Sequence, residues 1–184
     1  MKVSLNWLKD YVDVNVDTKT FADVLTATGT KAEGFEELSE GIKNIVVGTI
    51  LSTDKHPDAD RLTVCQIDVG AEEPVQIITA ATNVFPGAVV PVCLDGAVLA
   101  DGTKIKKGKL RGLPSNGMLC SIQELGLTIN DVPYAAEDGI LIIQDECHNG
   151  QDIKEALMMT DNTVDFELTF NRPDCLGIIG VARE

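Results

Sequence analysis

Residues 62–69, LTVCQIDV, set the fold class of this 184-residue chain, together with the apolar stretches around them. Side chains alternate along this segment: Cys65 and Ile67 fall on one face, and Gln66 and Asp68 on the other. A period of two is typical of a β-strand with one face on a core. The segment is therefore predicted to be a half-buried strand.

Similar short segments surround it. Further strands are predicted at residues 45–51, 75–79, 88–94 and 139–143. Turn signals stand between them at Pro86-Gly87, Asp95-Gly96 and Asp101-Gly102, and the capping-box pattern SIQE opens a short helix at residue 121. Five or so strands with one short helix in about 110 residues predict a small closed β-barrel.

The two ends of the chain have a different pattern. Helices are predicted near the N-terminus, one around Leu5 and Leu8 and one after Asp17 that stops at Gly29. The remaining expectations are a connection at 33–41, a helix at 152–159 and a strand at 165–170. The predicted class is mixed α+β, with a barrel at 41–149 inserted into a small α+β domain made from 1–40 and 150–184.

Composition excludes several classes of protein. The chain is 44% hydrophobic, so it can bury a core, but only 4% aromatic, which argues against a surface of stacking platforms for single strands. The polar start resembles no secretory signal, and no window of 18 apolar residues occurs, so a cytoplasmic location is expected. An odd count of five cysteines without a CxxC pair suits reduced thiols.

Catalytic and metal motifs are missing from the sequence. The two histidines, His56 and His148, lie in no HExxH arrangement, and neither GxSxG nor a phosphate-binding glycine loop occurs. Cys147-His148 is the only Cys/His neighbour pair, whereas a zinc site needs four ligands. No catalytic residue and no metal site are therefore expected in these residues.

A cluster of positive charge interrupts an acidic chain. The net charge is −14, yet residues 104–111 hold five cations and no acid: Lys104, Lys106, Lys107, Lys109 and Arg111. Such a cluster can attract phosphates, because local fields matter more than the summed charge for docking a polyanion. The alternative is a solvated edge strand that lysine protects against aggregation.

Two polar segments have similarly open interpretations. Residues 54–62, DKHPDADRL, either present Lys55, His56 and Arg61 to phosphate or sugar, or form a proline-led turn. Residues 113–121, LPSNGMLCS, either offer Ser115, Asn116 and Ser121 to a nucleic acid, or form a turn at Asn116 followed by core residues.

Read together, several motifs resemble the tRNA-binding OB-fold domain found in stand-alone tRNA-binding proteins, methionyl-tRNA synthetases and the β subunit of bacterial phenylalanyl-tRNA synthetase. The motifs are DKHPDADRL at 54–62, AATNV at 80–84, KKGKLR at 106–111, GMLCS at 117–121 and ELGL at 124–127. The flanks, MKVSLNWLKDYVD at 1–13 and FNRPDCLGIIGVARE at 170–184, are similar to those of the β subunit. The chain is therefore expected to be an N-terminal fragment of that subunit.

The resemblance implies a tRNA-binding part of a ligase that joins phenylalanine to tRNA. The parent enzyme would use ATP and Mg²⁺ and pair this subunit with α subunits and a second β subunit, while this fragment would carry no catalytic residue, cofactor or DNA-binding role. The tRNA-binding residues it implies are Lys55, His56, Arg61, Asn83, Lys104, Lys106, Lys107, Lys109, Arg111, Ser115, Asn116 and Ser121. Departures from the family pattern at 79–83 and at Ser121-Ile122 weaken the transfer in those two loops.

Two alternatives stay open at this point. One is that the barrel serves as a docking module within the heterotetramer and barely touches tRNA, which the acidity of the chain favours. A stand-alone tRNA-binding protein is the other alternative, although the flanking segments at 1–13 and 170–184 argue against it.

Overall fold

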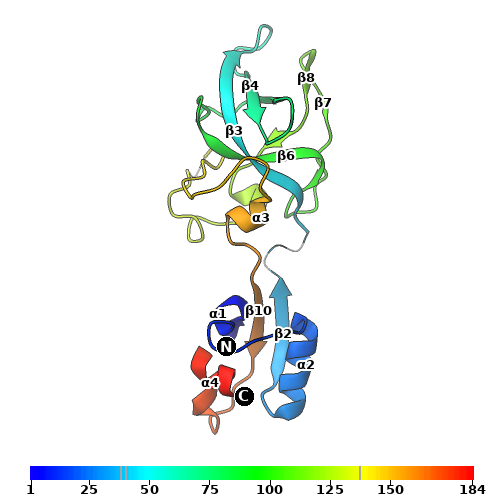
Figure 1. Cartoon of the computed structure of the whole chain (residues 1–184). Helices are drawn as coiled ribbons and strands as arrows, with labels where there is room; N and C mark the ends of the chain where they lie inside the picture. The colour runs from blue at the N-terminus through cyan, green and yellow to red at the C-terminus, as the bar shows by residue number, and fades with distance from the viewer. Residues whose placement is uncertain (38, 40, 137) are drawn as a thin grey trace. The chain divides into compact units, whose positions relative to one another are not determined.

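A computed structural model describes residues 1–37, 39, 41–136 and 138–184. Backbone contacts divide the chain into two units: Met1–Ser39 with Met159–Glu184, here called the terminal unit, and Glu40–Met158, here called the barrel unit (Figure 1). Residues 150–158 belong to the barrel unit, since the N–H of Val47 donates to the carbonyl of Gln151 at 2.9 Å.

A curled antiparallel sheet forms the barrel unit. Its five strands have the spatial order β5-β4-β3-β6-β9. Their bounds are β3 (Lys43–Lys55), β4 (Thr63–Asp68), β5 (Val75–Thr79), β6 (Val89–Val98) and β9 (Met118–Leu119). Strand β6 is longer than predicted, because it continues through the expected turn at Asp95-Gly96.

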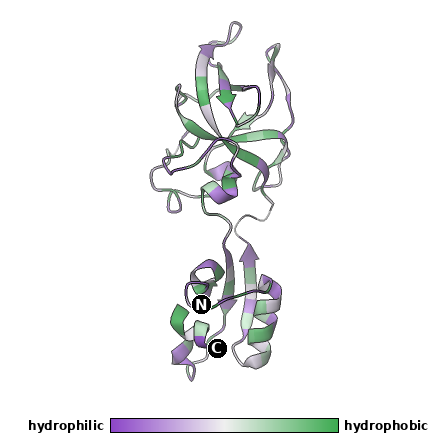
Figure 2. Cartoon of the chain, viewed as in Figure 1, coloured by the Kyte–Doolittle hydropathy of each residue, from purple (hydrophilic) through white to green (hydrophobic). Residues whose placement is uncertain are grey.

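The alternation of β4 is confirmed in the core. Cys65 and Ile67 are fully buried, against Ile50, Ile77 and Val90 of neighbouring strands. Figure 2 shows both hydrophobic and hydrophilic residues along the strands of this unit. Burial of this kind stabilises a sheet by roughly 25 cal/mol per Å² of apolar surface removed from water.

A small hairpin, β7 (Gly108–Leu110) with β8 (Leu113–Ser115), packs against the edge strand β5. The N–H of Ile78 donates to the Ser115 hydroxyl at 3.1 Å, and the side chain of Gln76 donates to the carbonyl of Pro114 at 2.7 Å. Strand β5 is thus covered instead of left open for pairing with another chain.

The terminal unit is a three-stranded antiparallel sheet with helices. Strand β10 (Asn162–Phe166) lies between β1 (Lys2–Ser4) and β2 (Ala32–Glu37), so segments from both ends of the chain pair directly. The helices are α1 (Leu5–Leu8), α2 (Thr18–Thr28) and α4 (Ile178–Arg183). The predicted mixed α+β class, with an OB-like barrel, is confirmed.

Local capping follows the sequence. Ser4 and Asp17 cap α1 and α2 with side-chain oxygens that accept from the N–H groups of Trp7 and Thr20. Gly29 ends α2 with φ 127°, a backbone conformation that favours glycine. The predicted short helix at residue 121 is a 3-10 turn, η1 (Gln123–Leu125).

Three predicted elements were wrong. Within 33–41, residues up to 37 belong to strand β2 instead of a connection, while residues 38 and 40 lie outside the described part of the chain. Residues 139–143 form no assigned strand, although Leu141 and Ile143 donate to the carbonyls of Cys120 and Val89. The expected strand at 165–170 is instead β10, because its partners β1 and β2 pair with residues up to 166.

The expected helix at 152–159 is shorter than its apolar spacing indicates. It is α3 (Ile153–Ala156), capped by the carboxylate of Asp152, which accepts from the N–H of Lys154 at 2.8 Å. Met158 has φ 53°, which a right-handed helix does not accommodate.

Among the described residues, no helix is long and apolar enough to cross a lipid bilayer.

Candidate nucleic-acid interface

Residues 104–111, here called the basic arm, lie on the outside of the barrel unit. All five of the arm's cations are exposed: Lys104, Lys106, Lys107, Lys109 and Arg111. Lys104 forms an isolated bridge with Val98 of β6, and β7 then carries the arm into the hairpin with every residue exposed. The bridge and the hairpin pairing therefore hold the backbone of the arm in place, while its charged side chains face water.

The tip of the hairpin is a two-residue turn, Arg111-Gly112. Both residues have positive φ, 47° and 90°, and Leu110 pairs with Leu113 on either side. Turns with two positive φ values match the twist of β-hairpins, but they are unfavourable for residues other than Gly, Asn or Asp. Arg111 is held at the tip in this unfavourable conformation.

Asp95 offsets part of the arm's positive charge. Its carboxylate accepts from the backbone N–H of Lys107 at 2.9 Å and lies 3.9 Å from the Lys107 ammonium nitrogen. This contact fixes the start of the hairpin to β6. Lys107 is consequently less available to a phosphate than its neighbours.

Lys55 and Arg61 line a groove of about 720 Å³ on the same unit. The groove runs between the β3–β4 loop and the segment after β5, and its lining residues are Thr53, Asp54, Lys55, Asp60, Arg61, Thr63, Ala80, Ala81, Thr82 and Val84. Two carboxylates share the groove with these two cations. The lining thus offers hydroxyls and alternating charges without an aromatic platform.

His56 is not presented to a ligand. Its side chain is buried, its Nδ1 accepts from the N–H of Asp58 at 3.1 Å, and its Nε2 lies 3.3 Å from the carbonyl oxygen of Leu110. Both ring nitrogens are engaged by the protein backbone, so the expected role of His56 as a direct contact does not fit its position.

The side chains of three other expected contacts are already hydrogen-bonded within the protein. The amide of Asn83 donates to the carbonyl and accepts from the N–H of Ile140, at 2.8 and 3.1 Å. Ser115 is buried and joins β8 to β5, and the Ser121 hydroxyl donates to Glu124 at 2.9 Å. Their polar groups hold loops in place, so they are poorly placed as direct contacts.

Asn116 differs from these residues because its side chain is exposed. Its backbone N–H donates to the carbonyl of Gln76 at 2.9 Å, which leaves its side chain at the base of the hairpin near the surface. Asn116 can therefore offer a polar contact to a ligand on the face where β8 lies.

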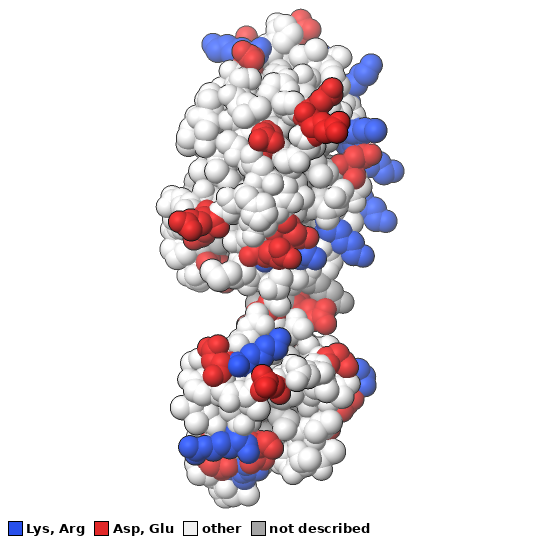
Figure 3. All heavy atoms as spheres, viewed as in Figure 1, with Lys and Arg blue, Asp and Glu red and all other residues white. Residues whose placement is uncertain are grey.

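Positive side chains gather along one edge of the barrel unit. In Figure 3, blue side chains line this edge, on the side where Figure 1 draws β7 and β8, with red side chains between some of them and on the surface that faces the viewer. A positive edge beside negative surfaces orients an approaching polyanion toward that edge.

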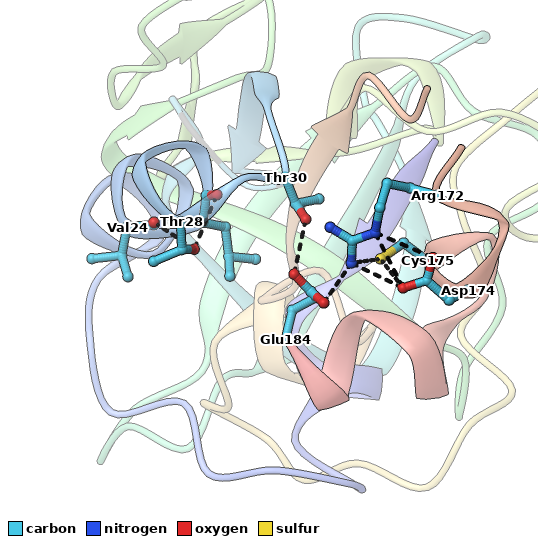
Figure 4. A network of polar contacts seen from close by, with 8 residues as sticks. Val24, Thr28, Thr30, Arg172, Asp174, Cys175 and Glu184 are labelled. Atoms are coloured by element: carbon cyan, nitrogen blue, oxygen red, sulfur yellow. Dashed lines mark hydrogen bonds and ion pairs between the residues drawn. The ribbon is translucent and has the colours of Figure 1, made fainter. Parts of the chain in front are cut away.

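The NRPDCLG segment makes a separate polar network within the terminal unit (Figure 4). The Arg172 guanidinium donates to Asp174 at 2.9 Å and to Glu184 of the α4 end, and Glu184 accepts from Thr30 at 3.3 Å. Hydrogen bonds from Arg172 hold the pKa of Asp174 below its ordinary value. The network fastens α4 to the turn before it.

The same network contains the one group of three or more possible metal ligands among the described residues, Asp174, Cys175 and Glu184. Mg²⁺ prefers six oxygen ligands, whereas this group offers a buried thiol and two carboxylates already bonded to a guanidinium. These residues do not fit Mg²⁺.

Fold and site together define a class: a small OB-like β-barrel with a cationic hairpin at one edge, suited to binding a nucleic-acid backbone. The family described as "Putative tRNA binding domain" matches residues 45–152, more than half of the chain. The chain belongs to this family of tRNA-binding domains.

Longer relatives share the whole length of the chain. The phenylalanine–tRNA ligase beta subunits of Clostridium tetani and Clostridium acetobutylicum are each 47% identical to it over 184 residues, and that of Latilactobacillus sakei is 48% identical. Each alignment covers 100% of this chain and 23% of the relative. The chain thus spans less than a quarter of the length of these curated relatives.

Solved structures show a weaker likeness. The C-terminal domain of Plasmodium vivax p43 is 23% identical, with a TM-score of 0.42 over 61% of this chain and 59% of that one. A MetRS related protein from Pyrococcus horikoshii is 20% identical, with a TM-score of 0.40 over 58% of this chain and 85% of that one. These scores are too low to add to the family assignment.

Proposed function

We propose that the barrel unit binds tRNA along the edge formed by the basic arm and the groove. The observation that carries this proposal is the exposure of all five arm cations in a chain whose net charge is −14. Cations gathered on one edge are the usual means by which proteins hold a phosphate backbone. Membership in the tRNA-binding family supports tRNA as the nucleic acid.

We propose that the cations of the basic arm contribute unequally to phosphate binding. Lys104, Lys106, Lys109 and Arg111 are the main proposed phosphate contacts, because they are exposed on the arm. Lys107 contributes less, since Asp95 lies beside it. These contacts position the tRNA and perform no chemistry.

A second set of contacts lies beside the arm. Lys55 and Arg61 are proposed to bind phosphates at the groove, with Asn116 able to reach a sugar or base edge. Asn83, Ser115 and Ser121 are proposed to shape the loops. Mutating them would then alter tRNA binding only through the fold.

We further propose that the two units are two domains, a tRNA-binding OB-fold inserted into a small α+β domain. Identity of 47% over the whole chain supports the interpretation that it is a region of a phenylalanine–tRNA ligase β subunit. The whole enzyme would attach phenylalanine to tRNA in the cytoplasm, with ATP and Mg²⁺ bound outside these residues. It would contain α subunits and a second β subunit.

Nuclear magnetic resonance on the 184-residue chain tests the tRNA proposal. Addition of unfractionated tRNA should shift or broaden the amide signals of residues 104–111 and of Lys55 and Arg61, and leave those of α2 in the terminal unit unchanged. Shifts confined to the terminal unit, or no shifts at low salt, would contradict the proposal.

A docking role is a second candidate, and it is favoured for the terminal unit. Large apolar side chains are exposed there, including Trp7 at 57%, Tyr11 at 51% and Leu176 at 66%. Exposed apolar side chains of this size are common at protein interfaces. If the unit docks on an α subunit, Trp7→Ser with Leu176→Ser should abolish co-elution with that subunit but leave tRNA binding unchanged.

A further inference from the structure

We propose that His56 is the positioning residue that joins the β3–β4 loop and the basic arm into one preformed cationic edge. The inference rests on the proposed tRNA binding and deepens it. Sequence reasoning placed His56 among the direct contacts, whereas the buried ring instead links two exposed segments.

The hydrogen bonds of His56 define which of its ring nitrogens carries the proton. The N–H of Asp58 can only donate, so Nδ1 of His56 must accept and carries no proton. The carbonyl of Leu110 can only accept, so the proton lies on Nε2 and is donated to that oxygen, 3.3 Å away. His56 is therefore the neutral Nε2–H tautomer, with one bond inside its own loop and one to the hairpin.

The second bond reaches the hairpin where its cations lie. Leu110 is the last residue of β7, with Lys109 before it and Arg111 after it at the turn. The base of the hairpin is already fixed to β5 through Ser115. His56 thus holds the tip while other contacts hold the base.

The bond spans two cationic segments. Lys55 precedes His56 directly and Arg61 closes the same loop, so a single side chain connects their loop to Lys109 and Arg111. An isolated two-stranded ribbon is at best marginally stable in water. Without the bond, the tip would have to be ordered when RNA binds, and that ordering weakens affinity.

Two amide variants separate the two bonds. In His56→Asn the side-chain oxygen can still accept from the N–H of Asp58, but the side chain is too short to reach Leu110. In His56→Gln the amide nitrogen extends to about the position of Nε2 and can donate to Leu110. The variants have the same charge and functional group and differ by one methylene, so each controls for the other.

We expect His56→Asn to bind unfractionated tRNA about five-fold more weakly than wild type, a factor near that of one net hydrogen bond. His56→Gln should restore affinity to within about two-fold of wild type by the same reasoning. Nitrogen-15 shifts of the His56 ring should show Nε2–H and an unprotonated Nδ1. The free energy of unfolding of each variant is measured alongside.

Equal affinities for the two variants, or losses that simply follow their unfolding free energies, would overturn the role of His56. The double variant Lys106→Glu with Lys109→Glu serves as the reference. If it binds as tightly as wild type, the proposed function fails and the inference falls with it. If it binds weakly while His56→Asn and His56→Gln both match wild type, the inference alone fails.

Discussion

Charge reversal at two positions of the basic arm, Lys106→Glu with Lys109→Glu, should weaken tRNA binding and reduce its salt dependence. Both side chains are exposed, so the substitutions leave the core intact. Lys107 is avoided because Asp95 accepts from its backbone and lies 3.9 Å from its ammonium nitrogen. A carboxylate at 107 would face Asp95 and disturb the hairpin.

The magnitude follows from counterion release. Each phosphate neutralised adds about 0.7 to 0.9 to the slope of log affinity against log salt, so two lost contacts should reduce the slope by about 1.4 to 1.8. Between about 50 and 200 mM salt, wild type should then lose about seven- to twelve-fold more affinity than the variant. At the lower salt the variant should already bind more weakly.

Fluorescence anisotropy with labelled tRNA at several salt concentrations measures these slopes. The matched control is Lys9→Glu with Arg183→Glu, which makes the same change in net charge at two exposed residues of the terminal unit. The control should keep the wild-type slope. Equal slopes for wild type and the arm variant, or equal losses in both variants, would refute the assignment of phosphate contacts to the arm.

Further predictions concern stability and reactivity. Gly117→Ala should lower the free energy of unfolding by about 1–3 kcal/mol in denaturant titrations, because a Cβ there would lie 2.1 Å from the carbonyl oxygen of Cys93. Mass-spectrometric labelling should modify half-buried Cys147 before the fully buried thiol of Cys93; the reverse order would contradict the burial. Arg172 lowers the pKa of Asp174, so this ion pair stabilises the fold above about pH 4 and the contribution is lost as pH falls further. Arg172→Met should therefore show a shallower loss of stability on acidification, and an unchanged pH profile would refute that role.

Local patterns predicted the elements whose causes are local. Ser4, Asp17 and Gly29 cap their helices through bonds to residues three or four positions away. The alternation around Cys65 and Ile67 marks a strand, because the core side of a sheet repeats every second residue.

Elements that depend on distant partners were not predictable in this way. Strand β1 is three residues long and exists because Val3 pairs with Val164. Strand β2 has five of its six residues exposed, so no apolar period marked it, and it forms by pairing with β10.

The same distinction holds for the candidate site: residues recognisable from local composition were predicted, and the roles that depend on distant partners were not. Exposed arm cations were identified from composition, since five cations without an acid stand out in an acidic chain. The inward roles of His56 and Asn83 were missed, because their partners Leu110 and Ile140 lie 54 and 57 residues away. Polar residue type alone does not tell a ligand contact from a loop anchor.

The central claim is tested most directly by titrating the 184-residue chain with unfractionated tRNA and with a matched duplex DNA across a range of salt concentrations. The account predicts saturable tRNA binding, tighter than DNA binding, with a salt slope equivalent to about three to five phosphates. Absence of tRNA binding even at low salt, or binding whose affinity does not change with salt, would contradict it.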